Sequence, residues 1–206
     1  MEKLENEEIE VEHKKVIIEE EEKKDEAMSN WSWASAVAEG IPPSARGGHS
    51  TTLVGQNLVI FGGHYYSDKN TGFVYLNDTH FLNVKESKWK KPYCNGKLPP
   101  PRYNHTAVYA AGEIFVFGGK GPNTTVYNDL YTFSPKSNSW LLAKETGEAP
   151  NPRYGHTANF YNKKIYIFGG WNGKSYFGDL HCFDLVKMAW TKVETKGKGP
   201  SARQGI

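Results

Sequence analysis

Short apolar runs that end at a glycine pair recur along this chain about every fifty residues. Each run has four consecutive apolar residues rich in β-branched and aromatic types, at positions 58–61, 114–117 and 165–168. Runs of this length and composition are typical of strands that are covered on both faces. No segment between the runs has a sustained helical period, so the pattern predicts short strands throughout this region.

Three further strands are predicted around each run. One precedes it, after a His-Ser or His-Thr pair and before a hairpin-like turn, at 51–54, 106–109 and 157–160. Another follows an Asp, at 79–84, 130–133 and 180–185, and the last carries a Trp. Four antiparallel strands form a sheet that cannot bury both faces alone. Neighbouring sheets are therefore expected to stack around a common axis.

Single residues recur at the same spacing as the runs, which indicates a repeat architecture. Glycine allows positive φ, and Trp can fill the gap between sheets. We therefore expect structural roles: each His bonds to backbone, each Asp caps a turn and each Arg braces the loops between sheets. The recurring residues are His49, His105, His156, Gly62, Gly63, Gly118, Gly119, Gly169, Gly170, Asp78, Asp129, Asp179, Trp89, Trp140, Trp190, Arg46, Arg102, Arg153 and Arg203.

The combination of Gly-Gly after four hydrophobic residues with a spaced Asp and Trp resembles the kelch repeat, and the match runs from about residue 33 to 203. The resemblance implies an all-β, kelch-type β-propeller made of four-stranded antiparallel blades. The Pro-x-x-Arg-x-x-His variant is similar to the kelch domains of Rab-effector, acyl-CoA-binding and cullin-adaptor-associated proteins.

The number of repeats predicts an incomplete propeller. Three full blades span about 46–101, 102–152 and 153–202, with an incoming outer strand at about 31–36 and a truncated repeat at 203–206. Propellers have four to eight blades, so we interpret the chain as a truncated gene model, an isoform or a piece of a longer chain. A half-ring completed by a second copy is the alternative, because open blade faces favour self-association.

The N-terminus has a different composition. Residues 1–28 contain twelve acidic residues and five Lys, a net charge of −7; because the whole chain is +2, residues 29–206 carry +9. This arm is predicted to be a disordered, solvated tail, and the alternative is an arm that folds over the basic propeller. The chain shows no secretory signal and no membrane-spanning run, and its two Cys form no disulfide framework. We expect a cytoplasmic protein without membrane insertion.

Catalytic chemistry is not predicted. The sequence has no phosphate-binding Gly-rich loop, no G-x-S-x-G elbow and no zinc-ligand cluster, so we expect no catalytic, cofactor-binding or metal-binding residues and no cofactor. A copper enzyme resembling galactose oxidase is the enzymatic alternative, but Cys94 follows Tyr93 beyond an outer strand, away from the axis. The positive charge is spread over many Lys, which argues against nucleic-acid binding.

Binding is predicted where the repeats differ. In a four-strand meander, the loop after Gly-Gly and the Pro-x-x-Arg link crowd one end of the blades, which we call the loop face. Aromatic residues beside Lys and Asn are typical of binding hot spots. Lys97, Lys196 and Lys198 favour an acidic peptide or acidic protein surface. We expect a non-catalytic interaction scaffold or partner-recognition module; actin binding is the alternative. The candidate residues are His64, Tyr65, Tyr66, Lys69, Lys120, Asn123, Trp171, Asn172, Lys174 and Tyr176.

Overall fold

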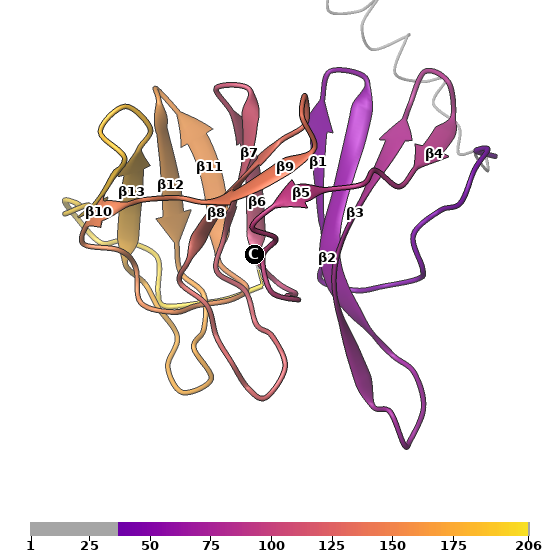
Figure 1. Ribbon diagram of the computed structural model, residues 1–206. Helices are drawn as coiled ribbons and strands as arrows, with labels where there is room; N and C mark the ends of the chain where they lie inside the picture. Colours follow the sequence, from indigo (N-terminus) through magenta and orange to yellow (C-terminus); the bar gives the residue numbers. More distant parts are fainter. Residues whose placement is uncertain (1–36, 206) are drawn as a thin grey trace, which may run out of the picture. The chain divides into compact units, whose positions relative to one another are not determined.

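The computed structural model describes residues 37–205 and contains three β-sheets that stand side by side (Figure 1). This part of the chain forms no helix, so it offers none that could cross a membrane. The acidic arm, the incoming strand at about 31–36 and Ile206 lie outside the described residues. The strands are β1 (Ser50–Val54), β2 (Asn57–Tyr66), β3 (Phe73–Asn83), β4 (Lys88–Lys90), β5 (Asn95–Gly96), β6 (Thr106–Ala110), β7 (Glu113–Phe117), β8 (Leu130–Ser134), β9 (Ser139–Leu142), β10 (Thr146–Gly147), β11 (Thr157–Tyr161), β12 (Lys164–Phe168), β13 (Leu180–Asp184) and β14 (Ala189–Lys192).

Each sheet corresponds to one sequence repeat. Blade 1 has the order β1-β2-β3-β4, blade 2 contains β6-β7-β8-β9 and blade 3 contains β11-β12-β13-β14, all with antiparallel neighbours. The three sheets do not close a ring within residues 37–205. The prediction of an all-β fold, with four-stranded antiparallel blades that form an incomplete propeller, is confirmed.

Blades 2 and 3 carry a fifth strand that the sequence did not predict. The link leaving blade 1 forms β5, which pairs in parallel with β9 of blade 2; β10 pairs with β14 of blade 3 in the same way. Glycines permit this contact: a Cβ on Gly96 or Gly147 would collide with the backbone of Trp140 or Trp190. Both glycines also have positive φ, near 81°. The link therefore pairs with the outer strand of the next blade before it continues to that blade's innermost strand.

Two apolar seams hold the blades together. Trp140 packs its ring 4.6 Å from Phe61 of blade 1 and 4.7 Å from Phe133 of its own blade. Trp190 repeats this arrangement, 5.0 Å from Phe117 of blade 2 and 5.0 Å from Phe183. Both tryptophans are almost fully buried. Their equivalent Trp89 is only half-buried, since no described blade precedes it.

Blade 1 differs from the others in its second hairpin. A loop was expected directly after the glycine pair, but β2 continues to Tyr66 and β3 begins at Phe73, so only residues 67–72 form the connection. The Asp68 carboxylate closes this turn by accepting bonds from the Asn70 and Thr71 amides, both at 2.8 Å. His64, Tyr65 and Tyr66 are therefore on a strand of a projecting hairpin (Figure 1).

Candidate functional site

Buried arginines fix the loop face relative to the blades. The Arg102 backbone belongs to blade 1: its amide donates to Leu76 O at 3.0 Å and its carbonyl accepts from the Gly63 amide at 2.8 Å. Its guanidinium, fully buried, donates to Asp129 and Gly118 of blade 2 at 2.6 and 2.8 Å. One residue thus joins two blades.

The same connection recurs at the next seam. Arg153 bonds through its backbone to blade 2 and through its guanidinium to Asp179 of blade 3, at 2.7 and 2.9 Å. The aspartates were expected to cap turns; instead they bind arginine in a bidentate manner, because a buried guanidinium needs a paired charge. The pKa of Asp179 is about 2: burial opposes the shift, and bonds from Arg153 and His181 outweigh it.

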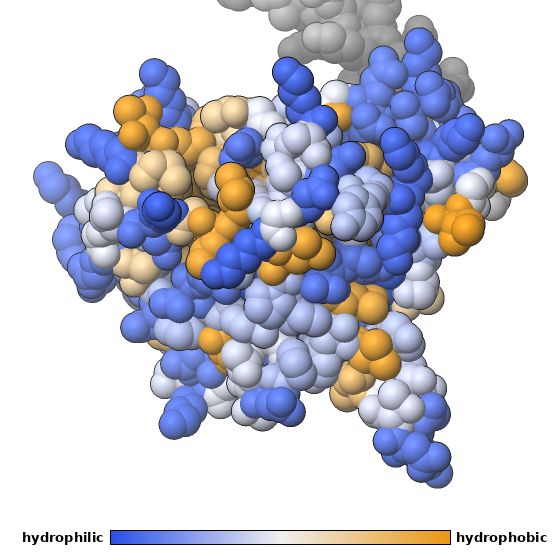
Figure 2. Space-filling view, in the orientation of Figure 1, coloured by the Kyte–Doolittle hydropathy of each residue, from blue (hydrophilic) through white to orange (hydrophobic). Residues whose placement is uncertain are grey.

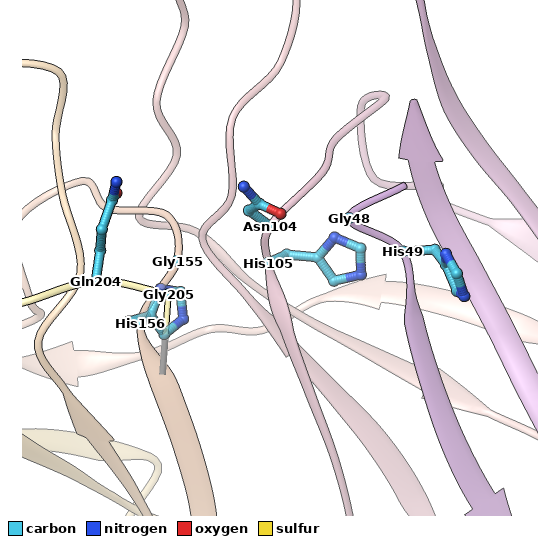
Figure 3. Close-up of a pocket in the computed structure, with 8 residues that line it drawn as sticks. All are labelled: Gly48, His49, Asn104, His105, Gly155, His156, Gln204 and Gly205. Atoms are coloured by element: carbon cyan, nitrogen blue, oxygen red, sulfur yellow. The ribbon is translucent and has the colours of Figure 1, made fainter. Parts of the chain in front are cut away.

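Histidines at the starts of the inner strands surround a pocket of about 270 Å³ between the blades (Figure 3). The His105 ring points toward the neighbouring blade, and its Nε2 lies 2.8 Å from the Ser50 hydroxyl. His156 Nε2 lies 2.8 Å from the Thr106 hydroxyl. The predicted bond to backbone is therefore wrong for these two histidines, which bond to the hydroxyl of the preceding repeat. The pocket is lined by Gly48, His49, Asn104, His105, Gly155, His156, Gln204 and Gly205.

Both buried histidines are neutral. Burial lowers the pKa of His105 to about 3, assisted by the nearby Arg102 guanidinium. Burial and Arg153 likewise lower the pKa of His156 to about 3. With Nε2 bonded to a hydroxyl and the proton affinity this low, neither imidazole is suited to acid–base chemistry near neutral pH.

A chain of backbone hydrogen bonds runs around the same pocket. The Asn104 amide donates to Gly48 O, Gly155 to Asn104 O, and Gly205 to Gly155 O, at 2.8, 2.8 and 2.9 Å. All four residues have positive φ, between 51° and 70°, and only Asn104 is not glycine. Asn tolerates this conformation well. The pocket mouth is thus a hydrogen-bonded backbone rim, and two exposed amide side chains, Asn104 and Gln204, line it.

Aromatic side chains lie beside this rim at the junction of blades 1 and 2. The His64 ring is 4.2 Å from Tyr103 of the following repeat and 5.4 Å from Phe73. Tyr66 stacks edge-on against Phe73 at 5.4 Å, and both rings are more than half exposed. Alternation along β2 places Tyr65 on the other face of the hairpin, paired with Val74.

The row continues across blades 2 and 3. Lys120 Nζ lies 5.4 Å from the centre of the Tyr154 ring, in a cation–π arrangement. The Trp171 ring packs against Tyr176 in a tilted arrangement with ring centres 4.3 Å apart, and a backbone bridge joins Trp171 to Tyr154. The structure therefore aligns residues from three blades into one aromatic and basic surface around the pocket.

The remaining candidates lie on loop tips. Lys69, Asn123 and Lys174 are exposed. The Asn172 side-chain oxygen accepts from the amides of Lys174 and Ser175, both at 2.8 Å, so it closes a turn. The exposed Lys97, Lys196 and Lys198 lie on the links.

Several residues of this surface were missed from the sequence, chiefly Tyr103, Tyr154, Asn104 and Gln204. They lie one or two positions after each repeated Arg and were passed over as part of the regular repeat. The signal was present, because the position after Arg reads Gly, Tyr, Tyr and Gln in successive units. Residues 37–205 contain no cluster of three or more His, Cys, Asp or Glu that could hold a metal ion.

Comparison with protein families gives one match to this architecture. The family model described as the KLHDC2/KLHL20/DRC7 Kelch-repeats domain matches residues 66–206.

Individual proteins are also similar. Kelch domain-containing protein 3 of Bos taurus is 34% identical over 187 residues, covering 86% of this chain and 48% of that protein. Rho GTPase-activating protein gacHH of Dictyostelium discoideum is 37% identical over 169 residues, covering 78% of this chain and 11% of the relative. Acyl-CoA-binding domain-containing protein 4 of Arabidopsis thaliana is 33% identical over 177 residues, covering 85% and 26% respectively. The chain spans about half the length, or less, of these relatives.

Proposed function

The chain belongs to the kelch-repeat family of β-propeller proteins, which act as protein-interaction modules, and we propose that it recognises a partner protein through its loop face. The observation that carries this proposal is the aromatic and basic row that spans three blades. His64, Lys120 and Trp171 occupy the same position after each glycine pair, yet they differ in chemistry.

Position and composition both support recognition at this surface. The repeated Arg, Asp and Trp side chains hold the blades together, whereas the side chains at the loop tips are exposed to solvent. Tyr66 and Tyr176 are each more than half exposed. Tyr and Trp are enriched at binding hot spots because they offer large contact area with few rotatable bonds.

We further propose that the partner segment is acidic and that the module is non-catalytic. Lys69 and Lys174 lie at the loop tips of blades 1 and 3, and Lys120 lies at the base of the blade 2 loop. A positive surface accelerates association with a negative partner. Neutral, hydroxyl-bonded His105 and His156 support a binding role for the pocket rather than proton transfer.

Affinity capture from cell extract, with quantitative mass spectrometry, tests the proposal. The double change Tyr66→Ala and Trp171→Ala should reduce enrichment of the proteins captured by the wild-type chain by about tenfold or more. Each truncation should cost about 1–3 kcal/mol of binding free energy, in the hot-spot range. High salt should weaken capture further if the partner is acidic.

The matched control is Tyr161→Ala, which removes an aromatic ring that is 71% exposed at the opposite end of blade 3. The melting temperatures of all variants should agree within the error of the measurement. If the double variant recovers the same proteins at the same level, the loop face is not the binding surface.

A further inference from the structure

The outer strand of blade 2 departs from the repeat in a way that the fold does not require. The two residues after the repeated Trp are Lys90 and Lys91 in blade 1 and Thr191 and Lys192 in blade 3. Blade 2 has Leu141 and Leu142 there, 58% and 38% exposed. Charged residues, Lys above all, normally protect such outer strands from unwanted pairing. Among the described blades, only blade 2 lacks that protection.

The edge of β9 is unpaired at the same residues. β5 covers only Ser139 and Trp140. The Ala143 amide donates inward to Leu130 O at 2.9 Å, so alternation turns the Leu142 N–H and C=O outward. Within residues 37–205 no other backbone group bonds to them. An added strand could therefore pair here.

An apolar groove of about 490 Å³ adjoins this edge, between blade 2 and the β13–β14 turn of blade 3. Its walls include Phe115 and Leu141 on blade 2, and Leu185 and Met188 on blade 3. Figure 2 shows apolar side chains gathered on the surface over this part of the two blades. The volume falls within the range of specific ligand sites.

Both walls of the groove differ from the equivalent walls of the seam between blades 1 and 2. At the equivalent positions between blades 1 and 2, Pro135 and Asn138 replace Leu185 and Met188, opposite Lys90 and Lys91. Met188 also has a φ of +52°, a conformation in which Asn is well tolerated and Met is uncommon. Apolar residues thus occupy positions where polar residues would be equally or more compatible with the backbone conformation and the exposure.

Positive charge surrounds the groove. Lys144 lines it, Lys187 precedes Met188, and the Lys163 carbonyl accepts from the Leu185 amide at 3.0 Å. All three lysines are exposed. The opposing carboxylates are Glu113, which also lines the groove, and Asp184, whose Oδ1 accepts from the Val186 and Lys187 amides of its own turn. An occupant with acidic flanks therefore matches the rim.

We propose that this groove binds an extended, acidic–aliphatic segment of a partner protein. The segment adds as a strand beside Leu142, inserts an aliphatic side chain between Leu141 and Met188, and directs its acidic residues at the lysines. This site lies at the end of the blades opposite the loop face and is independent of it.

Fluorescence polarisation with a labelled Glu-Glu-Leu-Val-Leu-Glu-Glu peptide tests the proposal. The full chain should bind it, and should bind two control peptides at least about tenfold more weakly: one with three Ser in place of the apolar residues, and one with Lys in place of each Glu. In an NMR titration the Leu142 amide should shift. No binding at about 1 mM, the weak end of specific affinity, overturns the proposal.

Two variants separate binding from folding. Leu141→Lys with Leu142→Lys installs the blade 1 residues, and Met188→Asn installs the blade 2 residue. Both should keep the wild-type melting temperature and weaken the peptide about tenfold or more. Leu53→Lys, at a leucine that is 60% exposed elsewhere, should leave affinity unchanged. Equal affinity in all variants would contradict the site. A dimer of this chain in sedimentation that the Leu141→Lys with Leu142→Lys variant no longer forms would also contradict it, because the groove would then be a dimer interface.

Discussion

The seam between blades 1 and 2 and the seam between blades 2 and 3 are built from the same parts. Each has a buried Trp against a Phe of the preceding blade, a buried Arg that joins two blades, and a His bonded to a hydroxyl of the preceding repeat. They differ at their margins, where Lys90 and Lys91 border one seam and Leu141 and Leu142 the other. Repetition therefore marks the positions that hold blades together, and departure from repetition marks surfaces free to recognise other molecules.

Removing one seam arginine should have the largest effect. Arg153→Met leaves Asp179 without its main partner and Gly169 O without a donor. We expect a loss of about 3–5 kcal/mol in the free energy of unfolding, toward the lower value because Asp179 is partly exposed. Chemical denaturation measures it. Arg203→Met is the control, since its guanidinium has no carboxylate partner within residues 37–205; an equal loss there would contradict the role of the pair.

Gly118→Val should break the same seam through the backbone. Gly118 has a φ of +64°, and a Cβ there would lie 2.6 Å from Arg153 O. Unfavourable φ costs about 1–2 kcal/mol and the steric clash about 1–3, so the sum is about 2–5 kcal/mol. Gly112→Val controls for φ alone, because Gly112 has positive φ but open space. Equal melting temperatures for these two variants would rule out the close approach.

Acid should protonate the two buried histidines, and so weaken both seams, before it protonates Asp179, whose pKa is about 2. His105 and His156 have pKa values of about 3 when folded, below the unfolded value, so their contribution is present at neutral pH and is lost as pH falls from about 6.5 toward 3. Each contributes a slope of about 1.4 kcal/mol per pH unit in that window. Denaturation midpoints between pH 7 and 4 measure it. His156→Gln should halve the slope and His64→Gln should not; an unchanged slope in His156→Gln refutes the assignment.

The smallest expected loss of stability comes from removing the side chain beside each tryptophan ring nitrogen, where the two seams differ. Trp190 Nε1 donates to Glu145 at 2.5 Å, whereas Trp140 Nε1 has no hydrogen-bond partner among residues 37–205 and has Cys94, a weak acceptor, at the position equivalent to Glu145. Glu145→Leu should cost about 1–3 kcal/mol, because it leaves a buried donor unpaired. Cys94→Ala should cost less. Equal losses in thermal unfolding would show that the two nitrogens have similar partners.

Burial raises the pKa of Glu145, so this carboxyl should favour folding at low pH and lose that contribution as pH rises through its folded pKa. The direction is opposite to that of the histidines. Glu145→Gln, which keeps an acceptor but no charge, should remove this component of the pH profile.

The fold could be predicted from the sequence because the apolar runs and the spaced Gly, Asp and Trp report strands and their covered faces directly. The two-residue strands β5 and β10 could not be predicted, because two residues are too few to show a periodicity and because their pairing depends on the next blade. The candidate site was predicted where the repeats differ in the loop after the glycine pair, as at His64, Lys120 and Trp171. Tyr103 and Tyr154 were not predicted because each follows an Arg that recurs in every repeat. Their contacts with His64 and Lys120 join neighbouring blades and depend on how the blades pack.

The most direct test of this account is a nuclear Overhauser spectrum of the tryptophan rings. Cross-peaks should connect Trp140 with Phe61 and Trp190 with Phe117, pairs whose ring centres lie 4.6 and 5.0 Å apart in different blades. Cross-peaks restricted to Phe133 and Phe183, within each tryptophan's own blade, would show that the blades do not pack through these rings.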